Sequence, residues 1–311
     1  MEYTRDNVIK ERWKLIKFIG GFMERNEVVV QLNKVDMYIS KKKYMEADKI
    51  LDDLLKNADY IEINEYGKIL DFNNQLEFVL YCNMNNCKKV AWKRNFLSIM
   101  YFQKGIICYE NMKYKEAMTF YEKALKWNPV DFKTYAEILE TCIKLHDYKK
   151  FDNYFEKAVQ ISIRPIQLAI LYRKRGFVCV DLGKDEVGYN NLLYSKLFFP
   201  RKEADVEIAY LEKKFGTKLK YFPDIGTVKF IEKMNMQYVM PEYVCKVYFS
   251  IIKFMNDVMI KEEMKTKENY LMLIDYYHSL YFFSPNETIH NQMLAIQREY
   301  ELKFPVSKEE K

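Results

Sequence analysis

Hydrophobic and polar positions along this chain alternate with the period of an α-helix rather than that of a strand. The clearest stretch predicts two helices, Ser98–Asn111 and Lys115–Asn128, joined by a turn at Lys113-Tyr114. Apolar or small residues recur there every three or four positions, which places them on one face of each helix. Pro129 ends the second helix, because proline disfavours the helical conformation in the residue before it. The pattern therefore predicts an antiparallel helix pair.

The same pattern occurs more than once. The recurring residues are Tyr101, Gly105 and Cys108, then Tyr135, Leu139 and Cys142, then Tyr172, Gly176 and Cys179. An earlier copy is visible around Val35, Tyr38, Ala47, Leu51 and Leu54. The three cysteines follow the period of the repeat, so we interpret them as small buried residues rather than as disulfide partners or metal ligands.

These residues resemble the tetratricopeptide repeat. The family places an aromatic residue at position 4, Gly or Ala at 8, a medium apolar residue at 11, Ala at 20, an aromatic residue at 24, Ala at 27 and Pro at 32. Here these are Tyr101, Gly105, Cys108, Ala117, Tyr121, Ala124 and Pro129. The next copy departs from the pattern at three positions, and the last copy ends with Gly188, Leu192, Ser195 and Pro200. Gly105 is expected to leave room for an aromatic ring of the neighbouring helix, at a cost to the helix of about 1 kcal/mol.

The resemblance covers roughly residues 28–61 and 98–202. It implies an all-α fold, an α-solenoid of antiparallel helix pairs that forms a right-handed superhelix with degenerate terminal helices. The expected segments are a capping helix at 1–27, repeats at 28–202 with a degenerate helix pair at 62–97, degenerate repeats or a closing helical bundle at 203–304, and a polar tail at 305–311.

Composition narrows the class of protein. The 50 Lys and Arg against 44 Asp and Glu give a net charge of +6, which is mild for 311 residues. No stretch approaches the roughly 20 apolar residues of a membrane helix. With 9 Gly and 7 Pro, a many-turned sandwich or barrel is disfavoured. The first residues lack the features of a secretory signal, so we expect a cytoplasmic protein.

Catalytic signatures are missing from the sequence. It has no P-loop, dinucleotide fingerprint, nucleophile elbow or paired-histidine zinc helix. We therefore expect no enzyme activity, cofactor or metal. The weaker alternatives are a zinc site at Cys82 and Cys87 and a dyad of Cys245 with His278.

A stack of helix pairs presents a concave surface made mainly of the first helix of each pair. In the resembled family, positions 2, 5, 9, 12 and 13 line this groove. The candidate groove residues are Ile99, Phe102, Ile106, Tyr109, Lys133, Glu140, Ile143, Arg173, Phe177 and Val180. Because many are apolar, we expect the groove to bind a peptide or a partner helix in a regulatory or scaffolding role. The family's clamp for acidic chaperone tails needs Lys at position 5 and Asn at position 9, and no copy has both.

Several alternatives stay open. The chain looks like the sensor domains of Gram-positive peptide-pheromone receptors, although residues 1–60 show no helix-turn-helix motif. A repeat-based regulator or phosphatase of signalling proteins could use Glu11, Glu24 or Gln31. Nucleic-acid binding through Arg173-Lys174-Arg175 is disfavoured, because most such clusters are solvated faces. The chain's own C-terminal helices could fill the groove, and a homo-oligomer is not excluded.

Overall fold

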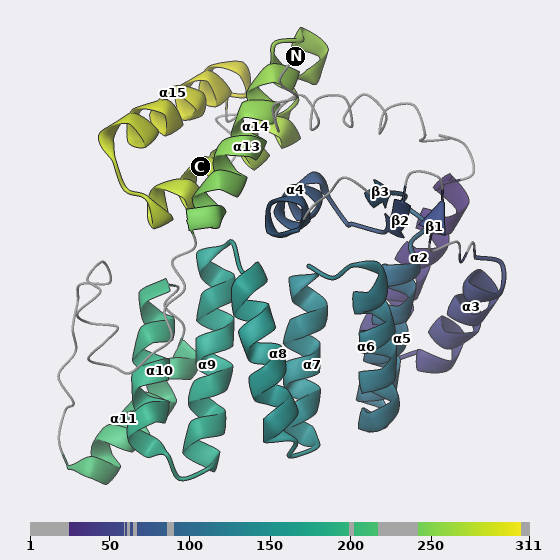
Figure 1. Cartoon of the computed structure of the whole chain (residues 1–311), viewed down its shortest axis with the longest axis vertical. Helices are drawn as coiled ribbons and strands as arrows, with labels where there is room; N and C mark the ends of the chain where they lie inside the picture. The colour runs from purple at the N-terminus through teal and green to yellow at the C-terminus, as the bar shows by residue number, and fades with distance from the viewer. Residues whose placement is uncertain are drawn as a thin grey trace. The chain divides into compact units, whose positions relative to one another are not determined.

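The computed structural model describes residues 25–58, 60, 63–64, 67–85, 90–198, 202–216 and 242–305. The capping helix expected to begin near Thr4, a helix expected at 227–238 and most of the polar tail lie outside these residues. The described chain is mostly helical, with helices packed as sequential pairs (Figure 1), which confirms the predicted fold class. It divides into two compact units, residues 1–81 with 85–147 (unit 1) and residues 82–84 with 148–311 (unit 2).

In unit 1, the described repeat region contains two helix pairs and one further helix, besides the helix of the segment 62–97 that is given below. The helices are α2 (Arg25–Ser40), α3 (Tyr44–Lys56), α5 (Leu97–Glu110), α6 (Tyr114–Trp127) and α7 (Phe132–Lys144). α2 packs on α3, and α5 packs on α6. The pair predicted at 98–111 and 115–128 therefore forms, with each helix ending one residue earlier than expected.

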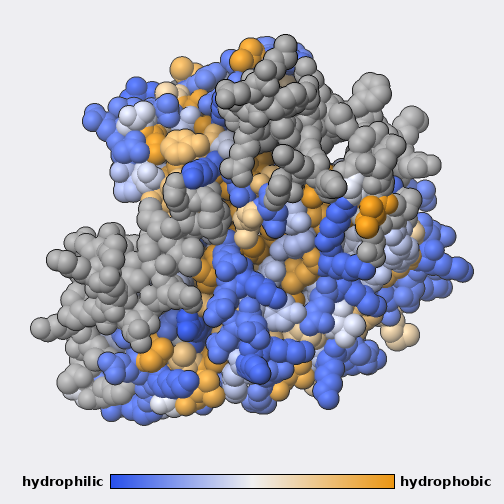
Figure 2. All heavy atoms as spheres, viewed as in Figure 1, coloured by the Kyte–Doolittle hydropathy of each residue, from blue (hydrophilic) through white to orange (hydrophobic). Residues whose placement is uncertain are grey.

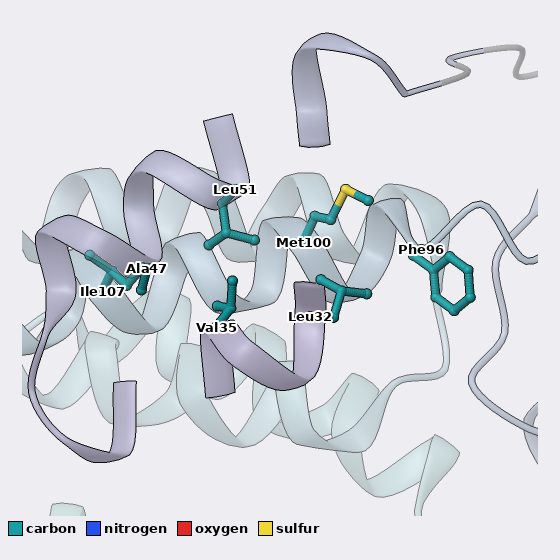
Figure 3. Close-up of a cluster of buried hydrophobic side chains, with 7 residues drawn as sticks. All are labelled: Leu32, Val35, Ala47, Leu51, Phe96, Met100 and Ile107. Atoms are coloured by element: carbon teal, nitrogen blue, oxygen red, sulfur yellow. The ribbon is translucent and has the colours of Figure 1, made fainter. Parts of the chain in front are cut away.

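A hydrophobic cluster joins the two pairs of unit 1. Figure 3 shows its seven buried side chains, with those from α2, α3 and α5 pointing toward one another. They are Leu32, Val35, Ala47, Leu51, Phe96, Met100 and Ile107. The earlier copy expected around Val35 and Leu51 is therefore a helix pair whose apolar stripe is buried against the next pair, which is how a repeat fold builds its core.

Several turns between consecutive helices share one backbone geometry, and this shows the repeat independently of the core. In four helix-to-helix turns one residue adopts a left-handed conformation, and these residues are Lys42, Met112, His146 and Gly183. The next residue donates its backbone N–H to a carbonyl five residues earlier, as Lys113 does to Cys108 at 2.9 Å and Lys184 does to Cys179 at 2.8 Å. This bond pattern satisfies the free carbonyls at the end of the first helix of each pair.

Residues 62–97 do not form the expected degenerate helix pair. They contain the strands β1 (Ile63–Asn64), β2 (Gly67–Leu70) and β3 (Val90–Trp92) and one helix, α4 (Gln75–Met84). β2 pairs with β1 in antiparallel fashion and with β3 in parallel fashion. The prediction was wrong because Asn74 caps α4, accepting a hydrogen bond from the Glu77 N–H at 3.0 Å, so the helix cannot extend back to Ile69.

Unit 2 continues the helix pairs. Its helices are α8 (Tyr148–Ile161), α9 (Pro165–Asp181), α10 (Asp185–Phe198), α11 (Lys202–Phe215), α13 (Glu242–Met259), α14 (Lys267–Phe283) and α15 (Glu287–Lys303). α9 and α10 approach closely at two glycines, Gly176 and Gly188. A Cβ at Gly188 would lie only 2.9 Å from the Gly176 carbonyl oxygen. α13 packs on α14 and α14 on α15, so these three helices pack in sequence order.

Two contacts join this bundle to the connection between α8 and α9. The Tyr248 hydroxyl on α13 donates a hydrogen bond to the Ile163 carbonyl oxygen at 2.7 Å. The Arg164 guanidinium forms an ion pair with Asp275 on α14 at 2.9 Å. The bundle therefore packs against the repeat region within unit 2. The predicted boundary at 202/203 stays a prediction.

Candidate functional site

Seven of the predicted groove residues lie on α5 and α7 in unit 1. We name six of them the α5–α7 face: Phe102, Ile106 and Tyr109 of α5 with Lys133, Glu140 and Ile143 of α7. α5 and α7 contact each other. Lys133 is exposed and the other five are half-buried, so apolar side chains remain partly open to solvent. Figure 2 shows hydrophobic residues between hydrophilic ones over α6 and α7.

α6 packs against α5 and α7 and so supports the α5–α7 face. The ring of Tyr121 packs over Gly105, where an added Cβ would lie 2.3 Å from the ring. The Phe102 ring lies 6.0 Å from the Tyr121 ring, centroid to centroid. This confirms the expectation that Gly105 leaves room for an aromatic ring. It also explains why Phe102, one turn from the glycine, is fixed rather than free to turn.

Ile99 is not part of this face. It packs against the core cluster of α2, α3 and α5. Sequence position 2 of the repeat faces the neighbouring pair here, since α2 and α3 both contact α5. Ile99 therefore contributes to packing between pairs.

Carboxylates surround Tyr109 at the end of α5. Its ring meets the Tyr114 ring edge to face at a centroid distance of 5.3 Å. Burial, and then the charges of Glu140, Glu137 and Glu110, raise the pKa of Tyr109 to about 12. Glu110 also accepts a hydrogen bond from the Tyr44 hydroxyl at 3.0 Å. Three carboxylates from two helices therefore act electrostatically on Tyr109, which sequence position alone did not indicate.

The other predicted groove residues lie on α9 in unit 2. Phe177 and Val180 are half-buried and pack against a cluster formed by α10 and α11. Arg173 is half-buried too. Phe177 and Val180 therefore take part in the core between successive helices, and their substitution would disturb packing as well as any binding.

The basic run on α9 is not an open cationic patch. Arg173, Lys174 and Arg175 are each half-buried. The Arg175 guanidinium lies over the ring of Phe155, 4.8 Å from its centroid, where the cation interacts with the ring face. A site for phosphate groups would need these charges to point into solvent, so this geometry gives the nucleic-acid alternative no support.

The sequence reasoning missed three carboxyl groups in unit 1, of which Asp71 and Asp131 are buried and Glu77 is half-buried. Asp71, at the end of β2, accepts a hydrogen bond from the Ser98 N–H at 3.1 Å and so caps α5, whose own cap residue Phe96 provides no side-chain bond. Burial raises the pKa of Asp71 to about 6, although the backbone hydrogen bonds that the carboxylate accepts and the charge of Arg94 act to lower it. The sequence held one signal of a buried carboxyl group, since Asp71 lies within the apolar run from Ile69 to Phe72.

Glu77 and Asp131 are the other two carboxyl groups that the sequence reasoning missed. Glu77 accepts hydrogen bonds from the Asn128 side chain at 2.7 Å and from the Asn73 N–H at 2.8 Å. Burial, and then the Asp131 charge, raise the pKa of Glu77 to about 7. Burial also raises the pKa of Asp131, which caps α7 and accepts from the Thr134 hydroxyl at 2.5 Å. These carboxyls attach the segment 63–92 to the repeat helices.

The remaining candidates for chemistry are dispersed. Cys108, Cys142 and Cys179 are buried and form no disulfide, as predicted for position 11. Cys245 is also outside a disulfide, whereas Cys82 is disulfide-bonded. In the part of the chain that the structure describes, no group of three or more His, Cys, Asp or Glu residues could hold a metal ion. His278 is exposed and lies 3.0 Å from Gln297.

Three further positions were singled out in the sequence. Gln31 is half-buried on α2, whereas Glu11 and Glu24 lie outside the described residues. The sequence did not indicate a cavity of about 500 Å³ in unit 2, between α13, α14 and the start of α15, lined by residues such as Phe249, Ile252 and Tyr277. Among the helices that the structure describes, none is long and apolar enough to cross a membrane.

Comparison with known proteins agrees with the helix pairing. The family model described as "Tetratricopeptide repeat" matches residues 99–131, the span of α5 and α6. The chain is also similar to tetratricopeptide repeat protein 21B of Xenopus laevis, with 27% identity over 172 residues. That alignment covers 54% of this chain and 12% of the relative, so the chain spans a small part of the relative's length. The paired helices, the glycine–aromatic contact and the repeated turns agree with this match, so residues 99–131 form a tetratricopeptide repeat and the chain is similar to proteins of that family.

Proposed function

We propose that this chain is a non-catalytic regulatory or scaffolding module that binds a peptide or a helix of a partner protein on the α5–α7 face. The observation that carries the proposal is the set of half-buried apolar side chains there, Phe102, Ile106 and Ile143. Apolar side chains that remain partly exposed on a rigid helix face gain free energy when a partner covers them, at roughly 25 cal/mol per Å² of apolar surface.

Cross-linking at defined positions tests this proposal. A photo-reactive amino acid at position 106 or 143 should cross-link to one defined segment of one partner in extracts of the native cell, identified by mass spectrometry. The control position is Met45 on α3, a methionine whose side chain is 86% exposed and which lies off the face. Cross-links that are equally frequent at position 45, or that are missing at both 106 and 143, would place the binding site elsewhere.

Loss of binding should follow from small polar substitutions. Ile106→Ser with Ile143→Ser should abolish partner capture and leave the unfolding curve close to that of the parent, because both side chains are only half-buried. Met45→Ser is the matched control. Phe177→Ser is less suitable, because Phe177 also packs against the α10–α11 cluster.

A further inference from the structure

The α5–α7 face joins an apolar surface to a concentration of negative charge. Its apolar part is formed by Phe102, Ile106 and Ile143, and its acidic part lies at Tyr109, where the charges of Glu110, Glu137 and Glu140 act on one hydroxyl. Since the three carboxylates come from two helices, α5 and α7, the helix packing and not one local motif brings them together.

A second observation points to the same place. The Tyr121 side chain is fully buried at 0% exposure, and its hydroxyl has no hydrogen-bond partner. After burial, the charge that raises the pKa of this tyrosine most is that of Glu137, followed by Tyr109, Cys108 and Glu110. A buried polar atom without a partner costs free energy. The charges of Glu137 and Glu110, which act on Tyr109, therefore also act on this buried hydroxyl.

We propose that the acidic part of the α5–α7 face binds the Lys or Arg side chain of a basic, amphipathic partner segment, whose apolar residues lie against Phe102, Ile106 and Ile143. This proposal rests on the proposed function and specifies the chemistry of the partner. Carboxylates form strong charge-assisted hydrogen bonds with guanidinium groups, and the neighbouring rings of Tyr109 and Tyr114 add a surface on which a cation is attracted.

The attraction must be local. The whole chain carries a net charge of +6, which repels a basic peptide at long range. Existing contacts also compete for the carboxylates. Glu110 accepts from Tyr44, and the exposed Lys144 follows Glu140 by four residues, a spacing that brings the two side chains within reach. The binding free energy of a partner cation is therefore most favourable where the cation displaces Lys144 and becomes partly desolvated against the tyrosine rings.

Synthetic peptides test the charge preference directly. Three fluorescein-labelled peptides share the same leucines at helical spacing and carry Arg, Gln or Glu at the same polar positions. In fluorescence polarisation with the full chain, we expect the Arg peptide to bind at least about tenfold more tightly than the Glu peptide. Its affinity should fall as salt rises from about 50 to about 300 mM, because salt screens exposed charges.

Substitutions of equal shape then locate the site. Glu110→Gln with Glu140→Gln should weaken binding of the Arg peptide by about tenfold and leave the Gln peptide unchanged. Lys144→Gln should strengthen binding of the Arg peptide, since it removes the competing cation. The control is Glu156→Gln on α8, an exposed carboxylate off the face, which should change neither.

The outcomes separate this inference from the proposed function. Equal binding of the three peptides, a preference for the Glu peptide, or an Arg preference that survives Glu110→Gln with Glu140→Gln would overturn it. Cross-links at positions 106 and 143 to a partner segment without Lys or Arg would also overturn it, while leaving the proposed function intact. Missing cross-links at both positions would overturn both.

Discussion

The Glu77 carboxylate on α4 accepts a hydrogen bond from the Asn128 side chain, 51 residues later in the sequence, at 2.7 Å. Asn128 ends α6, so the bond attaches the inserted strand-and-helix segment to the repeat at the point where the next helix begins. The Asn73 side chain lies on the other side of Glu77, with its Nδ2 3.3 Å from Oε1 and its buried Oδ1 without a partner. A neutral carboxyl or amide at position 77 could satisfy that oxygen after the Asn73 amide turns.

Glu77→Gln should therefore stabilise unit 1 at high pH and not at low pH. The pKa of Glu77 is raised to about 7, by burial and then by the Asp131 charge, from an ordinary value near 4.5. Since the folded state binds the proton more tightly than the unfolded state, the cost of the charged form grows as pH rises from about 4.5 to about 7 and is absent below that range. We expect an advantage for the variant of about 2 kcal/mol at pH 8 that falls as pH drops through 7 and vanishes below about pH 4.5.

Urea unfolding at a series of pH values measures this difference. Other groups act near Glu77, namely Asp131 and its neighbours Lys133 and Tyr135, so the comparison is made between variant and parent at each pH. Glu46→Gln, an exposed position on α3, is the control and should show no such trend. An advantage that is constant from pH 5 to 8 would contradict the assignment of the charge cost to Glu77.

Gly105→Ala should destabilise unit 1 even though alanine is the better helix former. An added Cβ would lie 2.3 Å from the Tyr121 ring, and the ring is fully buried and cannot move freely. We expect a loss of about 2 kcal/mol in the free energy of unfolding, and a larger one for Gly105→Leu. Combining Gly105→Ala with Tyr121→Leu should cost less than the sum of the single changes; simple additivity in thermal melts would argue against this contact.

The left-handed turn residues predict a pair of opposite effects. Met112 has φ of 60° and its side chain is 77% exposed, so Met112→Gly should raise the free energy of unfolding by about 1 kcal/mol. Gly183 has φ of 71° with open space around it, so Gly183→Ala should lower it by about 1 kcal/mol through backbone strain alone. Equal signs for the two changes in denaturant unfolding would mean that the turns are not equivalent.

Lys104→Met should weaken the contact between the first two helix pairs. The Lys104 ammonium group lies 2.6 Å from both Asp48 and Asp52 on α3, and its side chain is only 7% exposed. Methionine keeps the apolar stem but leaves the two carboxylates without their cation, at a cost of about 1–2 kcal/mol. Asp53→Asn, an exposed neighbour on α3, is the control. If the two variants unfold at the same denaturant concentration, the buried lysine does not stabilise this contact.

Local sequence determined the elements whose partners are near in the chain. The period of apolar residues, Gly105 with Tyr121, and Pro129 were sufficient to predict α5 and α6, because a helix hairpin is formed by contacts between residues within about one repeat. The copies around Val35 and Tyr172 followed from the same spacing. Buried cysteines at position 11 were predictable for the same reason.

Tertiary structure alone decided the features that join distant segments. β3 pairs with β2, from which it is separated by α4. Asp71 caps α5 by accepting a hydrogen bond from Ser98, 27 residues later, and no local sequence pattern indicates either partner. It also decided that Ile99 and Phe177 pack against clusters of neighbouring helices, although both are half-buried, as are Phe102 and Ile106. Helical periodicity shows which face of a helix is apolar, but only the neighbouring helices determine how much of that face they cover.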